Sequence, residues 1–375
     1  MEVGLFIFTI CIAFGYVMMI SRILTGWEGT SEWTIPNRYT PSTFVSIIIA
    51  ARNEEKSIKE CINSILKSDF PHDSYEIIVI DDASTDNTSQ QIKSIQDPRV
   101  RCILSNQNIG KKGAISLGIG LANGALIITT DADCIVQKYW LKSLVSYYET
   151  SKARLIAAPV QYNINKSLIQ RFQYIDCINN MAVTANGILN NAYFMANGAN
   201  LAYEKTLFTE LNGFEGSNDV ASGDDMFMIQ EAAKLNPSSV RFLKSKQAIV
   251  FTQPETSISS LIQQRKRWAT KTKTYSDKRI MKIQGYVFFF VALLLFNAAF
   301  SFFGSGLSFF GFLFGLFIKL SIDYMYLAKI HEYFKSKDAL KSFLPASIMF
   351  LGYIILAAWW AIFPSVYTWK GRKLK

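Results

Sequence analysis

Residues 44–55 read FVSIIIAARNEE, an apolar and β-branched run that ends in a polar, charged segment. A run of this kind is typical of a strand buried on both faces of a mainly parallel sheet. Three further runs have the same character: EIIVI (76–80), ALIITT (125–130) and LIAAPV (155–160). We therefore interpret residues 44–50 as the first of several central strands, each followed by a loop at its carboxyl end.

Helical patterns fill the intervals between these runs, at 54–67, 87–96, 111–122 and 138–149. Alternation of buried strands with helices predicts crossover units and a doubly wound α/β sheet. In such sheets ligands bind beyond the carboxyl ends of the strands. The residues that follow each strand are therefore the first candidates for a functional site.

Composition narrows the class of protein. The chain has 375 residues, a formal net charge of +10 and 50% hydrophobic residues. This length predicts about two domains, or one domain with membrane helices. The five cysteines are scattered without a C-x-x-C pair, which argues against disulfides or structural zinc and fits a reducing compartment. With His72 and His331 as the only histidines, acid–base chemistry falls to carboxylates.

Long uncharged segments near both ends of the sequence predict membrane helices. Residues 3–20 are long enough to cross a bilayer core and lack the basic start and cleavage site of a signal peptide. Further candidate spans lie at 285–303, 306–322 and 344–363. Because Arg22 follows the first segment, we expect the N-terminus outside and the domain between the spans in the cytoplasm.

These four spans conflict with the charge rule at the end of the sequence. A hairpin of 285–303 and 306–322 would be followed by a basic cytoplasmic loop around 329–341. A crossing by 344–363 would then leave the tail WKGRKLK outside, although positive charge normally stays in the cytoplasm. Either the last segment is re-entrant, or one span is misassigned. The first anchor and the basic flank at 265–282 carry more weight, and they predict a multi-pass protein of the inner (cytoplasmic) membrane with a cytoplasmic catalytic domain.

Acidic and polar loops follow three of the expected strands. ARNEE follows the first, DDASTD (81–86) the second and DADC (131–134) the third. Carboxylates at one sheet edge can bind sugar or base hydroxyls, or a divalent cation that they share with substrate phosphates. Each motif alone is weak, since a polar residue after a strand often only caps the next helix, as Ser84 and Asp86 would here. Their occurrence on successive strand ends is the stronger signal.

The chain resembles the membrane-bound family 2 glycosyltransferases through seven motifs in order: VSIIIAARNEE, VIDDASTDNT, NIGKKGAI, TTDADC, ANGANLAY, SGDDMF and QRKRW. Together they form that family's D, D, D, Q(Q/R)xRW signature over about residues 43–270. The resemblance implies the GT-A nucleotide-diphospho-sugar transferase fold, a doubly wound mixed sheet flanked by transmembrane helices. The domains would be an N-terminal anchor at 1–22, a catalytic domain at 43–255, interfacial helices at 256–284 and a transmembrane region at 285–375.

The resemblance also implies which residues surround a nucleotide-sugar donor. Those near the base and ribose would be Ala51, Arg52, Glu54, Asp81 and Asp82. Lys111 would lie close to the donor phosphates, at a helix start whose free N–H groups also favour anions. A solvated surface lysine is the alternative interpretation of Lys111.

A DxD motif and a catalytic base are implied next. Asp131 would contact the ribose or the donor sugar, and Asp133 would bind Mg²⁺ or Mn²⁺ on the diphosphate, where the metal offsets charge on the leaving group. Asp225 matches the base, with Asp224 beside it where many relatives have Glu. An ordinary acidic helix start is the alternative for this pair.

The last two motifs are implied to serve the acceptor and the diphosphate. ANGANLAY would contribute Gly198 and Asn200 to the acceptor side, with a plain turn as the alternative. QRKRW would contribute Gln264, Arg265, Arg267 and Trp268. Helical spacing predicts that Arg265 points largely away from the other three. Arginine suits a diphosphate, and Trp suits an acceptor platform or the membrane interface.

The implied activity is inverting transfer of a sugar from a nucleotide sugar, expected to be a UDP-sugar, to a hydroxyl of a membrane lipid. A processive synthase that extrudes a β-linked polysaccharide is the alternative, and the small number of membrane segments favours the lipid. A catalytically dead scaffold is disfavoured because the motif carboxylates are all retained. The basic residues gather beside the membrane, where anionic headgroups account for them, so no nucleic-acid partner is expected. The expected partners are the donor, a lipid or glycan acceptor and the bilayer.

Overall fold

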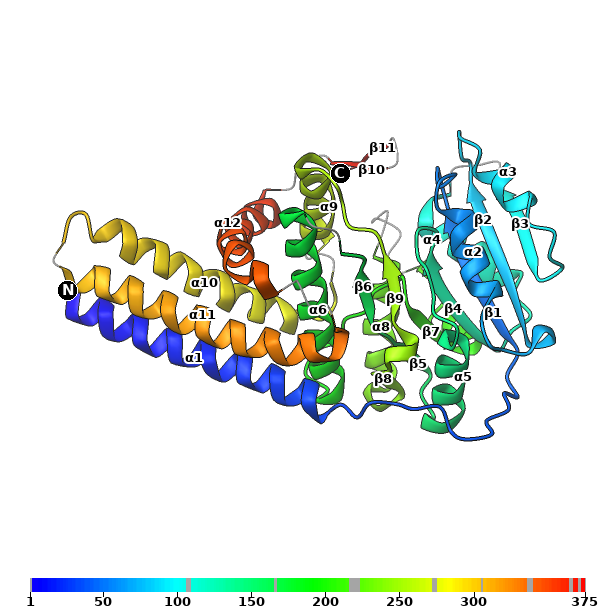
Figure 1. Cartoon of the computed structure of the whole chain (residues 1–375), viewed down its shortest axis with the longest axis horizontal. Coiled ribbons are helices and arrows are strands. Elements are labelled where there is room, and N and C mark those ends of the chain that lie inside the picture. The colour runs from blue at the N-terminus through cyan, green and yellow to red at the C-terminus, as the bar shows by residue number, and fades with distance from the viewer. Residues whose placement is uncertain are drawn as a thin grey trace.

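The computed structural model describes residues 2–105, 109–164, 167–215, 223–271, 275–304, 306–335, 340–363, 367–369 and 372–374. An α/β domain and a bundle of long helices lie at opposite ends of the molecule (Figure 1). Two helices, α6 (Leu168–Leu189) and α9 (Ile258–Lys271), lie between these two parts.

The α/β domain is built on a seven-stranded sheet with the order β3-β2-β1-β4-β7-β5-β8. Its strands are β1 Val45–Ala51, β2 Tyr75–Asp82, β3 Val100–Ser105, β4 Leu126–Asp131, β5 Leu155–Ala157, β7 Leu201–Glu204 and β8 Val240–Phe242. β7 runs antiparallel to both of its neighbours, whereas the remaining pairs are parallel. The prediction of a doubly wound mixed sheet flanked by apolar helices is confirmed.

Helices cover the sheet as the alternating pattern predicts. They are α2 Ile58–Leu66, α3 Thr88–Lys93, α4 Gly110–Gly120, α5 Trp140–Ser151, α7 Lys205–Glu210 and α8 Asp224–Leu235. The whole of β2 is buried, as expected for a strand covered on both faces. α4 packs closely on β1 because Gly118 has no side chain, and a Cβ there would lie only 2.6 Å from Ile48 Cγ2.

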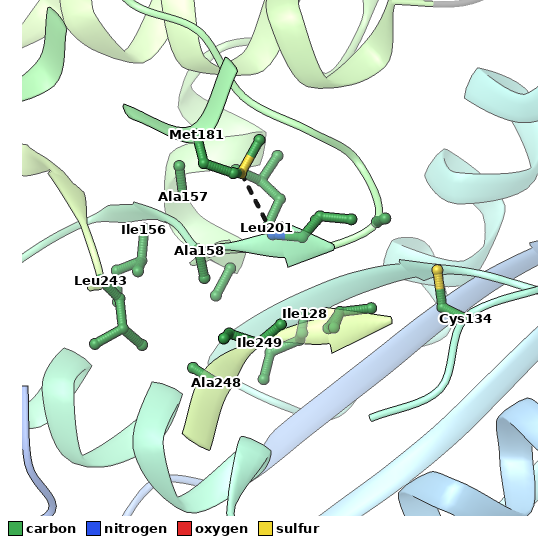
Figure 2. Packing of buried hydrophobic residues seen from close by; sticks show 14 of the residues in the cluster. Ile128, Cys134, Ile156, Ala157, Ala158, Met181, Leu201, Leu243, Ala248 and Ile249 are labelled. Atoms are coloured by element: carbon green, nitrogen blue, oxygen red, sulfur yellow. Dashed lines mark hydrogen bonds between the residues drawn. The ribbon is translucent and has the colours of Figure 1, made fainter. Parts of the chain in front are cut away.

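One predicted strand is divided in two by a proline. The run 155–160 gives β5 and then, after Pro159, β6 (Val160–Tyr162), which pairs with β9 (Val250–Thr252) in a separate parallel sheet. Proline has no N–H to donate to a ladder, which favours the break. Directly after the proline, the Val160 N–H donates to the sulfur of Met181 at 3.3 Å. This bond is the dashed line among the buried side chains of Figure 2.

α6 has no counterpart among the expected elements. Its buried residues include polar ones, among them Gln173, Asp176 and Asn186. A helix that is covered on most sides lacks the apolar stripe by which an amphipathic helix is recognised in a sequence. The spacing of apolar residues therefore does not predict this helix, which lies between the sheet and the bundle.

Four helices in the described part of the chain are long and apolar enough to cross a membrane: Glu2–Gly29 (α1), Arg279–Phe300 (α10), Gly306–Phe334 (α11) and Leu340–Ile362, which comprises a short 3₁₀ turn and α12 (Phe343–Ile362). The C-terminal strands β10 (Tyr367–Trp369) and β11 (Arg372–Leu374) form an antiparallel pair. α1, α10 and α11 run alongside one another (Figure 1).

The predicted end of the second hairpin helix at residue 322 is wrong, and so is the start of the loop expected around 329–341. α11 continues to Phe334 because the charges near its middle are neutralised inside the bundle. Lys319 Nζ lies 2.5 Å from Asp323 Oδ2, and the Tyr16 hydroxyl donates to Asp323 Oδ1 at 2.6 Å. Charged residues that pair in this way do not end a membrane helix.

Candidate active site

The strand ends identified in the sequence meet at one edge of the sheet. Ala51 lies opposite Asp81 of β2, and Ala50 lies opposite Asp131 of β4. A cavity of about 850 Å³ is lined by most of the expected site residues: Ala51, Arg52, Glu54, Asp82, Lys111, Asp131, Asp133, Gly198, Asp224, Asp225, Gln264, Arg265, Arg267 and Trp268. Asp81 and Asn200 do not line it.

The loops after β1 and β2 are tied to each other. Arg52 Nη1 donates to the carbonyls of Asp82 at 2.6 Å and Ala83 at 3.1 Å. Asn53 Oδ1 accepts the Thr85 N–H at 2.8 Å, and the Glu54 N–H donates to Thr88 Oγ1 at 2.7 Å. Arg52 therefore holds the loop after β2 in place at this end of the cavity.

Asp82 positions the helix that carries Lys111. Its carboxylate accepts the N–H groups of Ile109 at 2.8 Å and Gly110 at 3.2 Å, at the start of α4. Its neighbour Asp81 accepts the Ser84 N–H at 3.0 Å and so holds the turn after β2. Negative charge is favoured at a helix start, which explains why Asp82 remains buried there.

The remaining acidic residue of DDASTD has a capping role. Asp86 Oδ1 accepts the Thr88 N–H at 3.0 Å at the start of α3. Ser84 instead accepts the Asn53 N–H at 3.0 Å. Within this motif, the capping interpretation holds for Asp86 and not for Ser84.

Lys111 connects two walls of the cavity. Its Nζ lies 2.7 Å from Asp131 Oδ1 at the end of β4 and 3.7 Å from Asp224 Oδ2 at the start of α8. Burial alone disfavours the ammonium, but Asp131, Asp224 and Asp225 outweigh it and raise the pKa of Lys111 above its usual value. Lys111 is thus a charged residue inside the site, and the surface-lysine alternative is wrong.

Asp131 and Asp133 are arranged as candidate ligands for a cation. One ligand atom each of Asp131, Asp133 and Cys134 lies within 4.8 Å of the others. Burial, followed by the two carboxylates, raises the pKa of the Cys134 thiol, so the carboxylate oxygens are the available donors. Mg²⁺ and Mn²⁺ prefer oxygen ligands. The residues present therefore fit a divalent cation of this kind.

The start of α8 brings the adjacent carboxylates to the cavity. Asp225 Oδ2 accepts the Gly198 N–H at 3.0 Å, and its Oδ1 accepts the Met226 N–H at 2.8 Å. A Cβ at Gly198 would lie 3.2 Å from Lys111 Nζ and 3.3 Å from Asp224 Oδ2, so a larger residue there would crowd this ion pair. Ser222 of the SGDDMF motif lies outside the described residues.

The expected acceptor role of Asn200 is wrong. Asn200 is fully buried, and its Nδ2 donates to the carbonyls of Pro159 and Ala248, each at 2.8 Å. Its Oδ1 accepts the Trp140 indole N–H at 3.0 Å. The side chain is committed to joining the segment before β7 to Pro159, to the 3₁₀ turn Lys246–Ala248 and to α5, whereas Gly198, two residues earlier, reaches the cavity.

The expected orientation of Arg265 is also wrong. Arg265 is buried, forms an ion pair with Asp176 of α6 and lies over the rings of Trp268 at 4.5 Å and Tyr353 at 5.0 Å. Spacing along a helix defines its faces but not which faces are covered, and α9 is covered on this side by α6 and α12. Gln264 Nε2 donates to Glu255 Oε1 at 3.4 Å at the edge of the same wall.

The cavity continues into the helix bundle. At that end it is lined by Tyr16 of α1, by Lys319 and Asp323 of α11, and by Tyr353 and Ala357 of α12. In the sequence, Lys319 and Asp323 mark only a weaker membrane segment, and nothing marks Tyr16 or Asp176. One continuous space therefore joins the carboxylates at the sheet edge to apolar surfaces of the membrane helices.

Parts of the chain are similar in sequence to known proteins. Residues 46–208 match the family model described as Glycosyl transferase family 2. Glycosyltransferase AglE of Haloferax volcanii is 26% identical over 192 residues, which cover 50% of this chain and 61% of that protein. The Escherichia coli protein named UDP-Glc:alpha-D-GlcNAc-diphosphoundecaprenol beta-1,3-glucosyltransferase WfaP is 37% identical over 112 residues, 29% of this chain and 42% of that one.

A solved structure has a similar fold over nearly the whole chain. It is the mannosyltransferase PcManGT from Pyrobaculum calidifontis in complex with GDP-Man and Mn²⁺, with a TM-score of 0.59 and 17% identity, covering 97% of this chain and 99% of that one. At this identity the likeness establishes the fold alone. The chain spans 61% or less of the length of the curated relatives named above.

Proposed function

We propose that this chain, whose residues 46–208 match the model of glycosyl transferase family 2, moves a sugar from a nucleoside-diphosphate sugar to a hydroxyl of a membrane lipid. The observation that carries the proposal is the continuous cavity. Its sheet end offers carboxylates and Lys111, and its other end runs between helices apolar enough to lie in a bilayer. A lipid acceptor can keep its chain among those helices while its head reaches the carboxylates.

The printed names of similar proteins support the same substrate classes. One relative acts on a diphosphoundecaprenol with UDP-Glc, and the solved structure holds GDP-Man and Mn²⁺. A UDP-sugar is the first donor to test, and GDP-mannose is the second. A cation bound at Asp131 and Asp133 would supply positive charge to the departing diphosphate.

In the proposed reaction, Asp225 takes the proton of the acceptor hydroxyl. The acceptor oxygen forms a bond to the anomeric carbon as the bond from that carbon to the diphosphate oxygen breaks. The nucleoside diphosphate leaves with the bonding electron pair, and attack from the opposite face inverts the configuration. Lys111 offsets charge near the diphosphate, and its raised pKa keeps it protonated throughout. Asp224, buried beside Lys111, fixes the position of that ammonium.

Asp225→Asn tests the proposal directly. A general base typically contributes about 10²–10⁴-fold to the rate. We therefore expect turnover to fall by about that factor, with membrane insertion and donor binding retained. Membranes containing the protein would be incubated with radiolabelled UDP-sugars and GDP-mannose, and lipid extracts would be analysed by mass spectrometry.

Glu231→Gln is a matched control, because Glu231 lies on the same helix and pairs with the exposed Lys234. It should retain wild-type turnover. Label that partitions entirely into organic solvent as one product supports single transfer to a lipid. A long water-soluble polymer would contradict the lipid acceptor, and turnover by Asp225→Asn at the wild-type rate would contradict the assignment of the base.

A further inference from the structure

The last apolar helix does not run with the other three. Figure 1 shows α1, α10 and α11 lengthwise across the view, whereas α12 is seen nearly end-on, crosswise to them. α12 packs against α6, α9 and α10 and makes little contact with α11, the span that precedes it. Length and composition alone would make α12 a fourth crossing, but its direction does not match that of the bundle.

Along its whole length α12 contacts α6 or α9. Just before it begins, the Ser342 hydroxyl accepts a hydrogen bond from Arg171 of α6 at 2.7 Å. In its middle, the Phe350 ring lies 4.6 Å from the Phe172 ring of α6. Near its end, the Trp360 ring lies 5.8 Å from Lys266 Nζ of α9. Both of its ends therefore lie against α6 and α9, the two helices between the α/β domain and the bundle.

The length of α12 makes these contacts decisive. From Ser342 to Trp360 a straight helix extends about 27 Å, close to the roughly 30 Å thickness of a bilayer core. If α12 crossed the membrane, Trp360 would lie at the far surface, beside the turn between α10 and α11. The start of the chain lies at that same surface, since a Cβ at Gly304 in the turn would lie 2.6 Å from Glu2 Oε1. Trp360 lies instead beside Lys266 of α9.

The composition of the outward face of α12 indicates which environment it faces. Its most exposed side chains recur at helical spacing and are all apolar: Leu344, Ile348, Leu356, Trp359 and Ile362. A face of this composition, continuous with membrane-spanning helices, fits the acyl chains of a leaflet. Trp359 suits the boundary between acyl chains and headgroups.

We propose that α12 lies flat in the leaflet next to the catalytic domain, with only α1, α10 and α11 crossing the membrane. The acyl chains of that leaflet cover its outward face. Its inward face, with Tyr353 and Ala357, covers the membrane end of the cavity. The described C-terminal strands β10 and β11 then stay on the side of the catalytic domain, and the conflict with the charge rule disappears.

Epitope tags at the two ends of the full chain, with a third inserted after Phe303 in the turn between α10 and α11, test this topology. Sealed inverted membrane vesicles would be treated with protease. We expect the C-terminal tag to be digested together with the catalytic domain, while the N-terminal and Phe303 tags are protected. Protection of the C-terminal tag together with the N-terminal one would overturn the proposal. Neither result depends on glycosyl transfer.

A depth measurement separates a flat helix from a re-entrant one. Nitroxide labels would be placed by Leu344→Cys, Leu356→Cys and Ile362→Cys in a Cys11→Ser background, and their depths read by relaxation with oxygen and a nickel chelate. We expect the three depths to agree within about 5 Å. A steady increase approaching 27 Å, or a middle label much deeper than both outer ones, would overturn the flat arrangement.

Discussion

Two lysine–aspartate clusters lie at opposite ends of the same cavity, and they differ in how they are built. At the sheet end, Lys111 is shared by Asp131 and Asp224, and the side chains of Lys111 and Asp131 are 20% and 38% exposed. At the bundle end, Lys319 pairs with Asp323 four residues along α11, and their side chains are 7% and 15% exposed. Tyr16 completes that second cluster with a hydrogen bond to Asp323.

The difference in exposure and in connections suggests different roles. The Lys111 cluster can exchange its ion-pair partners for a ligand, whereas the charges of the Lys319 cluster are already paired with each other. Lys111 joins carboxylates from separate elements, one of which is a candidate cation ligand, so a diphosphate and a cation can take over both halves of the pair. The Lys319–Asp323 pair lies within α11, its charges neutralise each other, and Tyr16 links it to α1. We therefore expect the first cluster to act in catalysis and the second to hold α1 against α11.

Of the changes that test this comparison, Lys111→Ala should have the largest effect. Loss of a preorganised positive charge near a developing negative charge typically costs about 10²–10³-fold in rate, and we expect a fall in kcat/KM of that order without loss of the folded protein. Steady-state kinetics with the best donor would measure it. Lys59→Ala, which removes an exposed lysine on α2, should change kcat/KM less than about threefold. Equal effects of the two changes would remove the distinction between the clusters.

Lys319→Met should act on stability instead. Removing one partner of a buried ion pair typically costs about 3–5 kcal/mol because the other charge remains buried. We expect a lower unfolding temperature in detergent and largely retained specific activity of the folded fraction. The double variant Lys319→Met/Asp323→Leu should recover most of the lost stability. If Lys319→Met instead abolishes turnover at an unchanged unfolding temperature, the bundle cluster belongs to the reaction.

The smallest expected effect is from pH. Because the folded-state pKa of Lys111 is raised, its charge and its ion pairs are fully present below the usual lysine value of about 10.4 and are lost only above it. Affinity for a nucleoside diphosphate should therefore be unchanged by this residue between about pH 7 and pH 9, as titration calorimetry can show. A loss of affinity in that interval that Lys111→Arg abolishes would show that Lys111 deprotonates there.

The central strands and the residues after them can be predicted from the sequence because they depend on local patterns. β1, β2 and β4 are continuous apolar runs, and Asp82 and Asp131 follow from where those runs end. The partner of Arg265 cannot be predicted in this way. Asp176 lies 89 residues earlier, on a helix without an apolar stripe, and the pair forms only when α6 and α9 pack together. The role predicted for Asn200 is wrong for the same reason, since its hydrogen-bond partners lie on distant segments of the chain.

The reversed direction of β7 has a consequence for the order of assembly. After β4 and β5 the chain leaves the sheet, forms α6 against the membrane helices and returns as β7, which pairs between those two strands. Pairing across so long an interval carries the cost of closing a large loop before its contacts form. The four donor-side strands, β1 to β4, all lie within residues 45–131 and are therefore synthesised before α6 and β7. During synthesis we therefore expect the nucleotide half to mature first, and the acceptor wall with Gly198 to be completed only once the chain has reached the bilayer.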